Sequence, residues 1–316
     1  ELMFTSQHTD ANELMALFSA DKGSEEETVA DNTTSEETKQ EADNTQSEPF
    51  LVPTDVDFSF VTDIREAVVF DQLARELGGH LYVKDGILIL EEMGFICNAA
   101  KLQLTAMYKT PRRNHLFLGL DYHMIDINIQ ELVNMIPQID TMMPMLRSFR
   151  GGAELHLAAE TYLNANYDIK PSTTRGAVSI TGKDLVLLDS ETFGKIAKLL
   201  MFNKKTENKV DSISVQATLF KKEIDIYPFC MSIDNYMAAV GGRHNLDMTF
   251  DYHISLLKPL YLGVDVGGNF DDLKIKLAKC RYAQDFRPIF RKDVETQNAS
   301  LKKMINEALK RTVRIE

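Results

Sequence analysis

The tripeptide Asp-Tyr-His occurs twice, as Asp121-Tyr122-His123 and as Asp251-Tyr252-His253. In a β-strand the first and third residues point to the same face, so each copy places a carboxylate beside an imidazole. Such a pair can act as an acid and a base, or it can contribute ligands to a metal ion. It can equally line the wet side of an amphipathic strand. We favour the interpretation that both copies line the wet side of a strand, because nothing in the sequence indicates that they meet in one pocket.

Other signatures of catalysis are missing from the sequence. It contains no phosphate-binding loop, no dinucleotide-binding glycine motif, no nucleophile elbow and no His-Glu-x-x-His. We interpret Arg243 and His244, in a glycine-containing turn, as solvent-facing polar residues, like the Asp and His of the two tripeptides. We therefore expect a non-enzymatic protein with no catalytic residues, no metal site and no cofactor. An enzyme would need the two Asp-His pairs, or other polar groups, to share one pocket.

The three cysteines, Cys97, Cys230 and Cys280, lie far apart and show no Cys-x-x-Cys spacing. Each lies in or beside an apolar strand pattern, so we interpret them as small buried hydrophobic residues. A disulfide between two of them or a role in metal binding stays open, because spacing alone does not decide it.

The clearest pattern in the chain is a series of strands towards its C-terminal end. From Leu246 to Ile254, apolar and polar residues alternate strictly, which predicts a half-buried strand. Two more strands follow, one after Pro259 and one after Gly267-Gly268-Asn269. Connections this short predict an antiparallel sheet, since parallel neighbours need a long crossover. The apolar residues of the first two strands are Leu246, Met248, Phe250, Tyr252, Ile254, Leu260, Leu262, Val264 and Val266.

Similar strand patterns occur upstream, beginning near Phe50. Asp85-Gly86 predicts a tight hairpin turn, and Leu102 and Leu104 belong to an alternating strand from Lys101 to Met107. Helix-spaced apolar residues interrupt the strands at 128–149 and 191–202. A loose repeat relates the segments that begin at Lys101 and Asn245, each with a strand, a proline-containing turn and a second strand. We predict a mostly β (α+β) fold, an elongated twisted antiparallel sheet or β-groove with a few covering helices.

The charge of the chain is uneven. Of the formal net charge of −12, residues 21–49 carry −8, with ten acidic residues against two lysines. This segment has the composition of a disordered acidic linker. The remaining −4 is spread over the rest of the chain, without the clustered Lys and Arg of a nucleic-acid surface. We predict a short helical segment over 1–20, the linker over 21–49, a β-rich domain over 50–285 and a helical tail over 286–316.

The segments GGRHNLDMTFDYHI and LGVDVGGNFDDLKIKL, separated by a proline, resemble the C-terminal region of the AsmA family of Gram-negative envelope proteins. The resemblance continues upstream into KDGILILEEMGFICNAAKLQLTAMY and covers roughly residues 50–285. It implies a periplasmic protein of outer-membrane biogenesis, anchored to the inner membrane by an N-terminal segment that precedes this fragment. No run here approaches the ~18 apolar residues of a membrane-spanning helix, so we expect the fragment itself to be soluble.

The strands offer more apolar face than the two predicted helices can cover, so part of the sheet is left for a ligand or a partner. Together with the resemblance, this predicts a protein that holds or conveys phospholipid or other lipid acyl chains along an apolar groove. The candidate lipid-binding residues are Leu246, Met248, Phe250, Tyr252, Ile254, Leu260, Leu262, Val264, Leu102 and Leu104. The alternative is a structural or interaction module of the envelope that binds protein or glycan without lipid. In either case an envelope protein is a possible partner.

Overall fold

The computed structural model describes residues 2–10, 49–69, 72–135, 149–188, 207–210, 213–233, 236–258, 261–269 and 272–281, together with Ala299, Lys303 and Glu307. Residues 11–20 of the predicted N-terminal helical segment, the helical segment predicted over 191–202 and nearly all of the predicted linker lie outside these residues.

Strands account for most of the described chain. The first six are β1 (Leu2–Ser6), β2 (Thr9–Asp10), β3 (Phe58–Val69), β4 (Gln72–Lys84), β5 (Ile87–Ile96) and β6 (Lys101–Arg112). Next come β7 (His115–Asn128), helix α2 (Ile129–Met135), β8 (Phe149–Leu163), the 3-10 turn η2 (Pro171–Thr173) and β9 (Arg175–Leu188). The last strands are β10 (Glu207–Val210), β11 (Ile213–Phe220), β12 (Glu223–Ile233), β13 (Tyr236–Asn245), β14 (Phe250–Lys258), β15 (Leu262–Gly268) and β16 (Leu273–Ala278).

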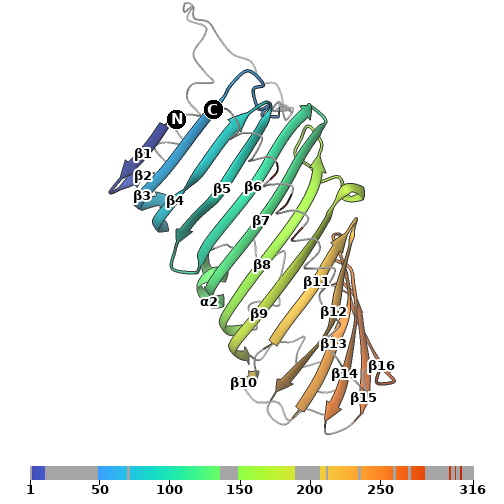
Figure 1. Ribbon diagram of the computed structural model, residues 1–316. Helices are drawn as coiled ribbons and strands as arrows, with labels where there is room; N and C mark the ends of the chain where they lie inside the picture. The colour runs from blue at the N-terminus through green and yellow to red at the C-terminus, as the bar shows by residue number, and fades with distance from the viewer. Residues whose placement is uncertain are drawn as a thin grey trace, which may run out of the picture.

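All sixteen strands belong to one open sheet in which sequence neighbours are mostly spatial neighbours (Figure 1). From β3 to β16 every pairing is antiparallel, which confirms the predicted mostly β fold. The exceptions are β1 and β2, which run parallel to β3 and make the sheet mixed. The prediction of a helical segment over 1–20 is therefore wrong for residues 2–10, because the alternation Leu2-x-Phe4 packs beside Phe60 of β3.

The sheet is bent as well as twisted. Register shifts interrupt β5 between Leu90 and Met93 and β7 between Met124 and Ile127. Each shift contains an acidic residue at positive φ, Glu92 at 51° and Asp126 at 54°. Such bulges bend a strand and increase its twist.

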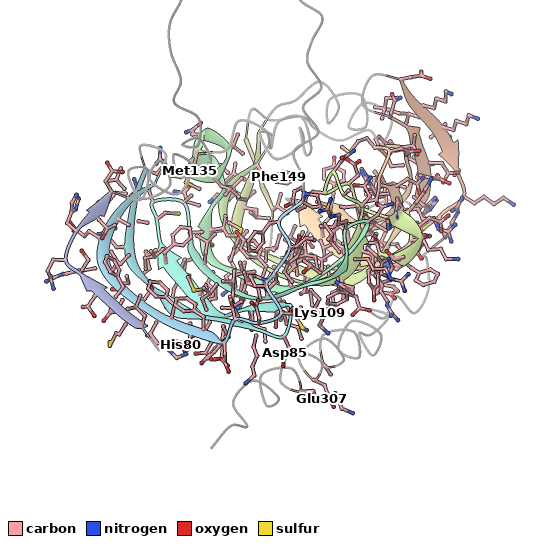
Figure 2. All side chains as sticks on the ribbon, turned by 90° about the horizontal axis from the view of Figure 1, so that it is seen from above. His80, Asp85, Lys109, Met135, Phe149 and Glu307 are labelled. Atoms are coloured by element: carbon pink, nitrogen blue, oxygen red, sulfur yellow. The ribbon has the colours of Figure 1, made fainter. Side chains whose placement is uncertain are left out.

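Figure 2 shows the resulting curve from above, with Met135 and Phe149 on its open side and His80 on the opposite side. We call the side that carries α2 and Phe149 the concave face and the other side the outer face.

Two predicted turns had different outcomes. Asp85-Gly86 forms the predicted hairpin turn between β4 and β5, with Asp85 at φ 50°. The predicted strand from Leu246, however, begins only at Phe250. Residues 246–249 form the turn between β13 and β14, because Asp247 Oδ1 accepts hydrogen bonds from the Thr249 N–H (3.0 Å) and hydroxyl (2.6 Å). Local side-chain bonding of this kind competes with the strand that alternation alone predicts.

Helix α2 belongs to the helical segment predicted over 128–149, in which two short helices separated by Pro137 were expected. The last residue of that segment, Phe149, instead begins strand β8, so the prediction is wrong there. The N-terminus of α2 is capped by Asn128, whose Oδ1 accepts hydrogen bonds from the N–H groups of Gln130 (3.1 Å) and Glu131 (3.2 Å). The buried residues Ile129, Leu132 and Val133 pack against the concave face. In the predicted C-terminal tail, the described residues Ala299, Lys303 and Glu307 are helical.

Candidate functional site

Cross-strand pairing assembles the apolar side chains of separate strands into one face. Residues directly opposite each other on antiparallel strands point to the same side of the sheet. One row therefore crosses the molecule through Leu104, Tyr122, Leu157, Val178, Ala217, Ile226, Tyr252, Val266 and Ile275. Because Leu102 and Leu155 of the neighbouring row pack with α2, this is the concave face.

The centre of this face is only half-buried. We use the name apolar face for ten half-buried side chains of β6 to β11: Leu102, Leu104, Leu118, Leu120, Tyr122, Leu155, Leu157, Val178, Ile180 and Val215. On the outer face, by contrast, Ile89 and Met107 are fully buried. Full burial of one large apolar side chain stabilises a fold by roughly 1.5 to 3 kcal/mol. The side chains of the apolar face are therefore still partly exposed, and an apolar ligand that covers them can complete their burial.

Local structure covers both margins of the apolar face, where the strands end. On one margin α2 packs with the segment 97–100, and the Asn128 N–H donates to the Ala99 carbonyl at 2.8 Å. On the other margin, residues 50–54 cross the strand ends. There the Tyr108 hydroxyl donates to the Phe50 carbonyl at 2.9 Å, and the Val52 N–H donates to Thr110 at 2.9 Å. Within the described chain, the central side chains of the apolar face lie between these two covered margins.

Two partly buried tyrosines on the concave side of the sheet have raised pKa values. Burial raises the pKa of Tyr122 to about 12, with the neighbouring Cys97 thiol adding to the effect. Burial alone raises the pKa of Tyr252 to about 12. Its hydroxyl lies 3.1 Å from Nδ1 of His244, whose pKa burial lowers. A face that disfavours phenolate and imidazolium charge suits uncharged ligand groups.

The outer face holds the polar partners of the first Asp-Tyr-His copy. His123 Nε2 lies 2.8 Å from a Glu154 oxygen, and His156 Nε2 lies 2.5 Å from an Asp121 oxygen. The two imidazole rings are 5.0 Å apart. Each ring thus pairs with a carboxylate on the neighbouring strand.

The second copy is enclosed. His253 is 2% exposed, with Nδ1 2.6 Å from Asp265 and Nε2 2.8 Å from the Ser255 hydroxyl. The Arg281 N–H donates to Ser255 Oγ at 3.0 Å, and the Arg281 guanidinium binds Asp265 at 3.1 Å. We call His253, Ser255, Asp265 and Arg281 the C-terminal anchor, because they hold the chain after β16 against β14 and β15.

The order Ser255, His253, Asp265 matches the hydrogen-bond order of a hydrolase triad. Ser255 is 0% exposed, however, and its oxygen already accepts the Arg281 N–H, so a substrate cannot reach the hydroxyl in this arrangement. The two Asp-His pairs lie on the separate strands β7 and β14 and do not meet. Across the described residues, no group of three His, Cys, Asp or Glu side chains is placed to hold a metal ion.

Two cavities lined by described residues lie outside the apolar face. The larger, about 380 Å³, adjoins the start of α2 and is lined by Asp126, Gln130, Arg150, Glu154 and Lys183 among others. The smaller, about 210 Å³, lies on the outer face between β6 and β9. Its wall includes Tyr162, which stacks on His115 at 4.0 Å and meets the edge of Phe117 at 5.3 Å.

We compared the chain with known proteins. No family model, curated protein or solved structure matches the chain. The helices within the described ranges are all too short or too polar to cross a membrane.

The predicted lipid-binding residues divide into three groups. Leu102 and Leu104 lie on the apolar face. Phe250, Tyr252, Ile254, Leu262 and Val264 lie on the same side of the sheet, but in a packed cluster where Phe250 is 7% and Val264 0% exposed. Leu246 and Met248 belong to the turn before β14, and Leu260 lies outside the described residues.

Most of the apolar face was not among the predicted site residues. The missed residues are those of β7, β8, β9 and β11, such as Leu120, Leu157 and Ile180. Their alternation with polar neighbours was visible in the sequence. What was not visible was which strand set stays half-exposed, since this depends on where α2 and the segment 50–54 pack.

Proposed function

We propose that this chain is a non-enzymatic cell-envelope protein of the AsmA-like type, which holds or conveys phospholipid acyl chains in outer-membrane biogenesis. The observation that carries the proposal is the apolar face, ten half-buried side chains contributed by neighbouring strands on the concave side of one sheet. Acyl chains lying on this face lose contact with water at a gain of about 0.8 kcal/mol per CH₂ group. Their head groups stay in solvent, and no covalent step is needed.

The periplasmic location and the inner-membrane anchor come with the AsmA resemblance and belong to the same proposal. The concave curvature supports it, because a curved sheet lets several strands contact one flexible chain (Figure 2). The partial burial of Tyr122 and Tyr252 supports it further, since apolar surroundings that raise the pKa of these phenols disfavour charged ligand groups on this side of the sheet.

The test begins with lipid extraction from protein expressed in a Gram-negative host. We expect co-purified phospholipid, and uptake from vesicles whose acyl chains carry bromine. The chain has ten tyrosines and no tryptophan, so brominated lipid bound at the apolar face quenches the tyrosine emission. A protein that carries no lipid after purification and takes up none from vesicles contradicts the proposal.

A matched pair of variants tests whether lipid binds at the apolar face. Leu104 and Gln103 are neighbours on β6 that point to the concave and outer faces, respectively. Leu104→Glu puts a carboxylate among acyl chains, and we expect it to lower uptake by at least about fivefold. Gln103→Glu adds the same charge on the outer face and leaves uptake unchanged. Equal effects of the two substitutions would remove the apolar face from the proposal.

A second candidate function, an interaction module that binds glycan, is favoured by the smaller outer cavity. Its wall combines the Tyr162 and Phe117 rings with Glu160 and Arg175, which form an ion pair. Aromatic faces and charged hydrogen-bonding groups together suit a sugar ring. Soluble oligosaccharide that binds wild type but not Tyr162→Ala, with no lipid uptake by either protein, would favour this candidate.

A further inference from the structure

Among the described residues, β16 is the last strand at one edge of the sheet, and it pairs only with β15. Its side chains separate cleanly by face. Leu273, Ile275 and Leu277 continue the concave side, whereas Lys274 and Lys276 point to the outer side. Leu277 is 62% exposed, and the Lys274 side chain is 65% exposed while its Nζ lies 3.2 Å from the exposed carboxylate of Asp272. An edge strand with an apolar side and open backbone groups is a template for another strand.

The two lysines restrict what can pair with this edge. If a second copy paired antiparallel through β16 about Ile275, Lys274 of one copy would lie opposite Lys276 of the other. Like charges directly opposite each other destabilise a strand pair. The opposite edge strand β1, with the sequence LMFTS, carries no charge at all. The lysines therefore act against self-association at β16 and favour a negatively charged neighbour, whose carboxylate replaces the exposed Asp272 as the partner of Lys274.

We infer that β16 binds an extended segment of another protein in which apolar and acidic residues alternate. Its apolar side chains continue the concave side beyond Leu277, and its carboxylates face Lys274 and Lys276. Backbone hydrogen bonds supply affinity in such a strand addition, and alternate side chains supply specificity. The inference depends on the edge and its charges and holds whether or not the apolar face binds lipid.

The test uses two fluorescent peptides of roughly eight residues, one alternating Glu with Val and the other Lys with Val. Fluorescence anisotropy with the wild-type protein should show tighter binding of the Glu peptide. The double variant Lys274→Glu/Lys276→Glu should lose roughly tenfold in affinity for the Glu peptide and prefer the Lys peptide. The control, Lys101→Glu/Lys183→Glu, has the same net charge with both changes at exposed positions on interior strands. It should keep the wild-type preference.

Amide hydrogen exchange locates the bound peptide, and protection is expected across Leu273–Ala278. Three results would overturn the inference: equal binding of both peptides to wild type, the same loss in the Lys101→Glu/Lys183→Glu control, or protection confined to another strand. Self-association of the wild-type chain that disappears on adding the Glu peptide would also contradict it, since a second copy would then be the natural occupant of the edge.

Discussion

The hairpins β6–β7 and β14–β15 carry the same tripeptide and use it differently. In both, the tyrosine points to the concave face and the histidine to the outer face. His123 keeps 29% of its side chain exposed and pairs with Glu154 on β8. His253 is 2% exposed and is bound on both nitrogens, by Asp265 and Ser255. The tripeptide therefore fixes the direction of each side chain, and the adjoining strands decide what it does.

The difference arises from the chain segment that comes after each hairpin. After β15 the chain forms β16 and returns, so that Lys279 and Arg281 lie over β14 and β15 on the outer side. Nothing comparable covers the outer side of β7 within the described residues, where His123 and His156 lie side by side and half-exposed. Burial makes each hydrogen bond of the second copy costly to break, whereas the first copy can exchange its partners for water.

The largest expected effect compares the two histidines directly. His253→Ala removes the shared partner of Ser255 and Asp265 and opens a small cavity, so we expect a loss of about 2 to 3 kcal/mol in the free energy of unfolding. His123→Ala breaks a half-exposed pair and should cost less than about 1 kcal/mol. Urea unfolding of both variants in one buffer measures the difference. Equal losses would mean that the C-terminal anchor adds no more to stability than the half-exposed pair of His123 and Glu154.

A smaller effect is expected at the glycines of β15. A Cβ on Gly263 would lie 2.4 Å from the Lys279 carbonyl oxygen and 2.9 Å from the His253 ring. We expect Gly263→Ala to cost about 1 to 2 kcal/mol by forcing the chain after β16 off the sheet. The control is Gly267→Ala on the same strand, where the nearest atom would be at an ordinary 3.4 Å.

Thermal unfolding, combined with trypsin cleavage at Lys279 and Arg281, tests the expected release. Gly263→Ala should unfold at lower temperature and be cut faster than wild type, and Gly267→Ala should resemble wild type in both. A Gly263→Ala protein with wild-type cleavage would show that this chain segment tolerates the added methyl group.

Sequence pattern predicted much of this architecture but only part of the site. Alternation at Leu102 and Leu104 predicted both the strand and its apolar side, because side-chain direction in a strand depends on neighbouring residues alone. The partners of His253 could not be predicted in the same way, since Asp265 and Arg281 reach it through sheet pairing and a chain return. The parallel pairing of β1 with β3 is equally non-local, because residues 7–57 separate the two strands.

The smallest expected effect concerns what the two hairpins share. The pKa of Tyr122 and that of Tyr252 are both raised to about 12, so the folded protein holds these phenols neutral when the unfolded chain already ionises near pH 10. Their stabilising contribution is complete below pH 10 and is lost as the pH rises towards 12. Tyr122→Phe and Tyr252→Phe should therefore each weaken the alkaline fall in melting temperature, and to a similar extent.

Phenolate absorbance measured during an alkaline titration gives an independent check, because each variant should lose one late-ionising group. Tyr261→Phe is the control for losing a phenol at an exposed position, since Tyr261 is 68% exposed. If only Tyr252→Phe removed a late-ionising group, the concave sides of the two hairpins would differ in their access to water. The apolar face around Tyr122 would then be wetter than the packed cluster around Tyr252, and its affinity for acyl chains would have to come from the neighbouring leucines of β7 and β8.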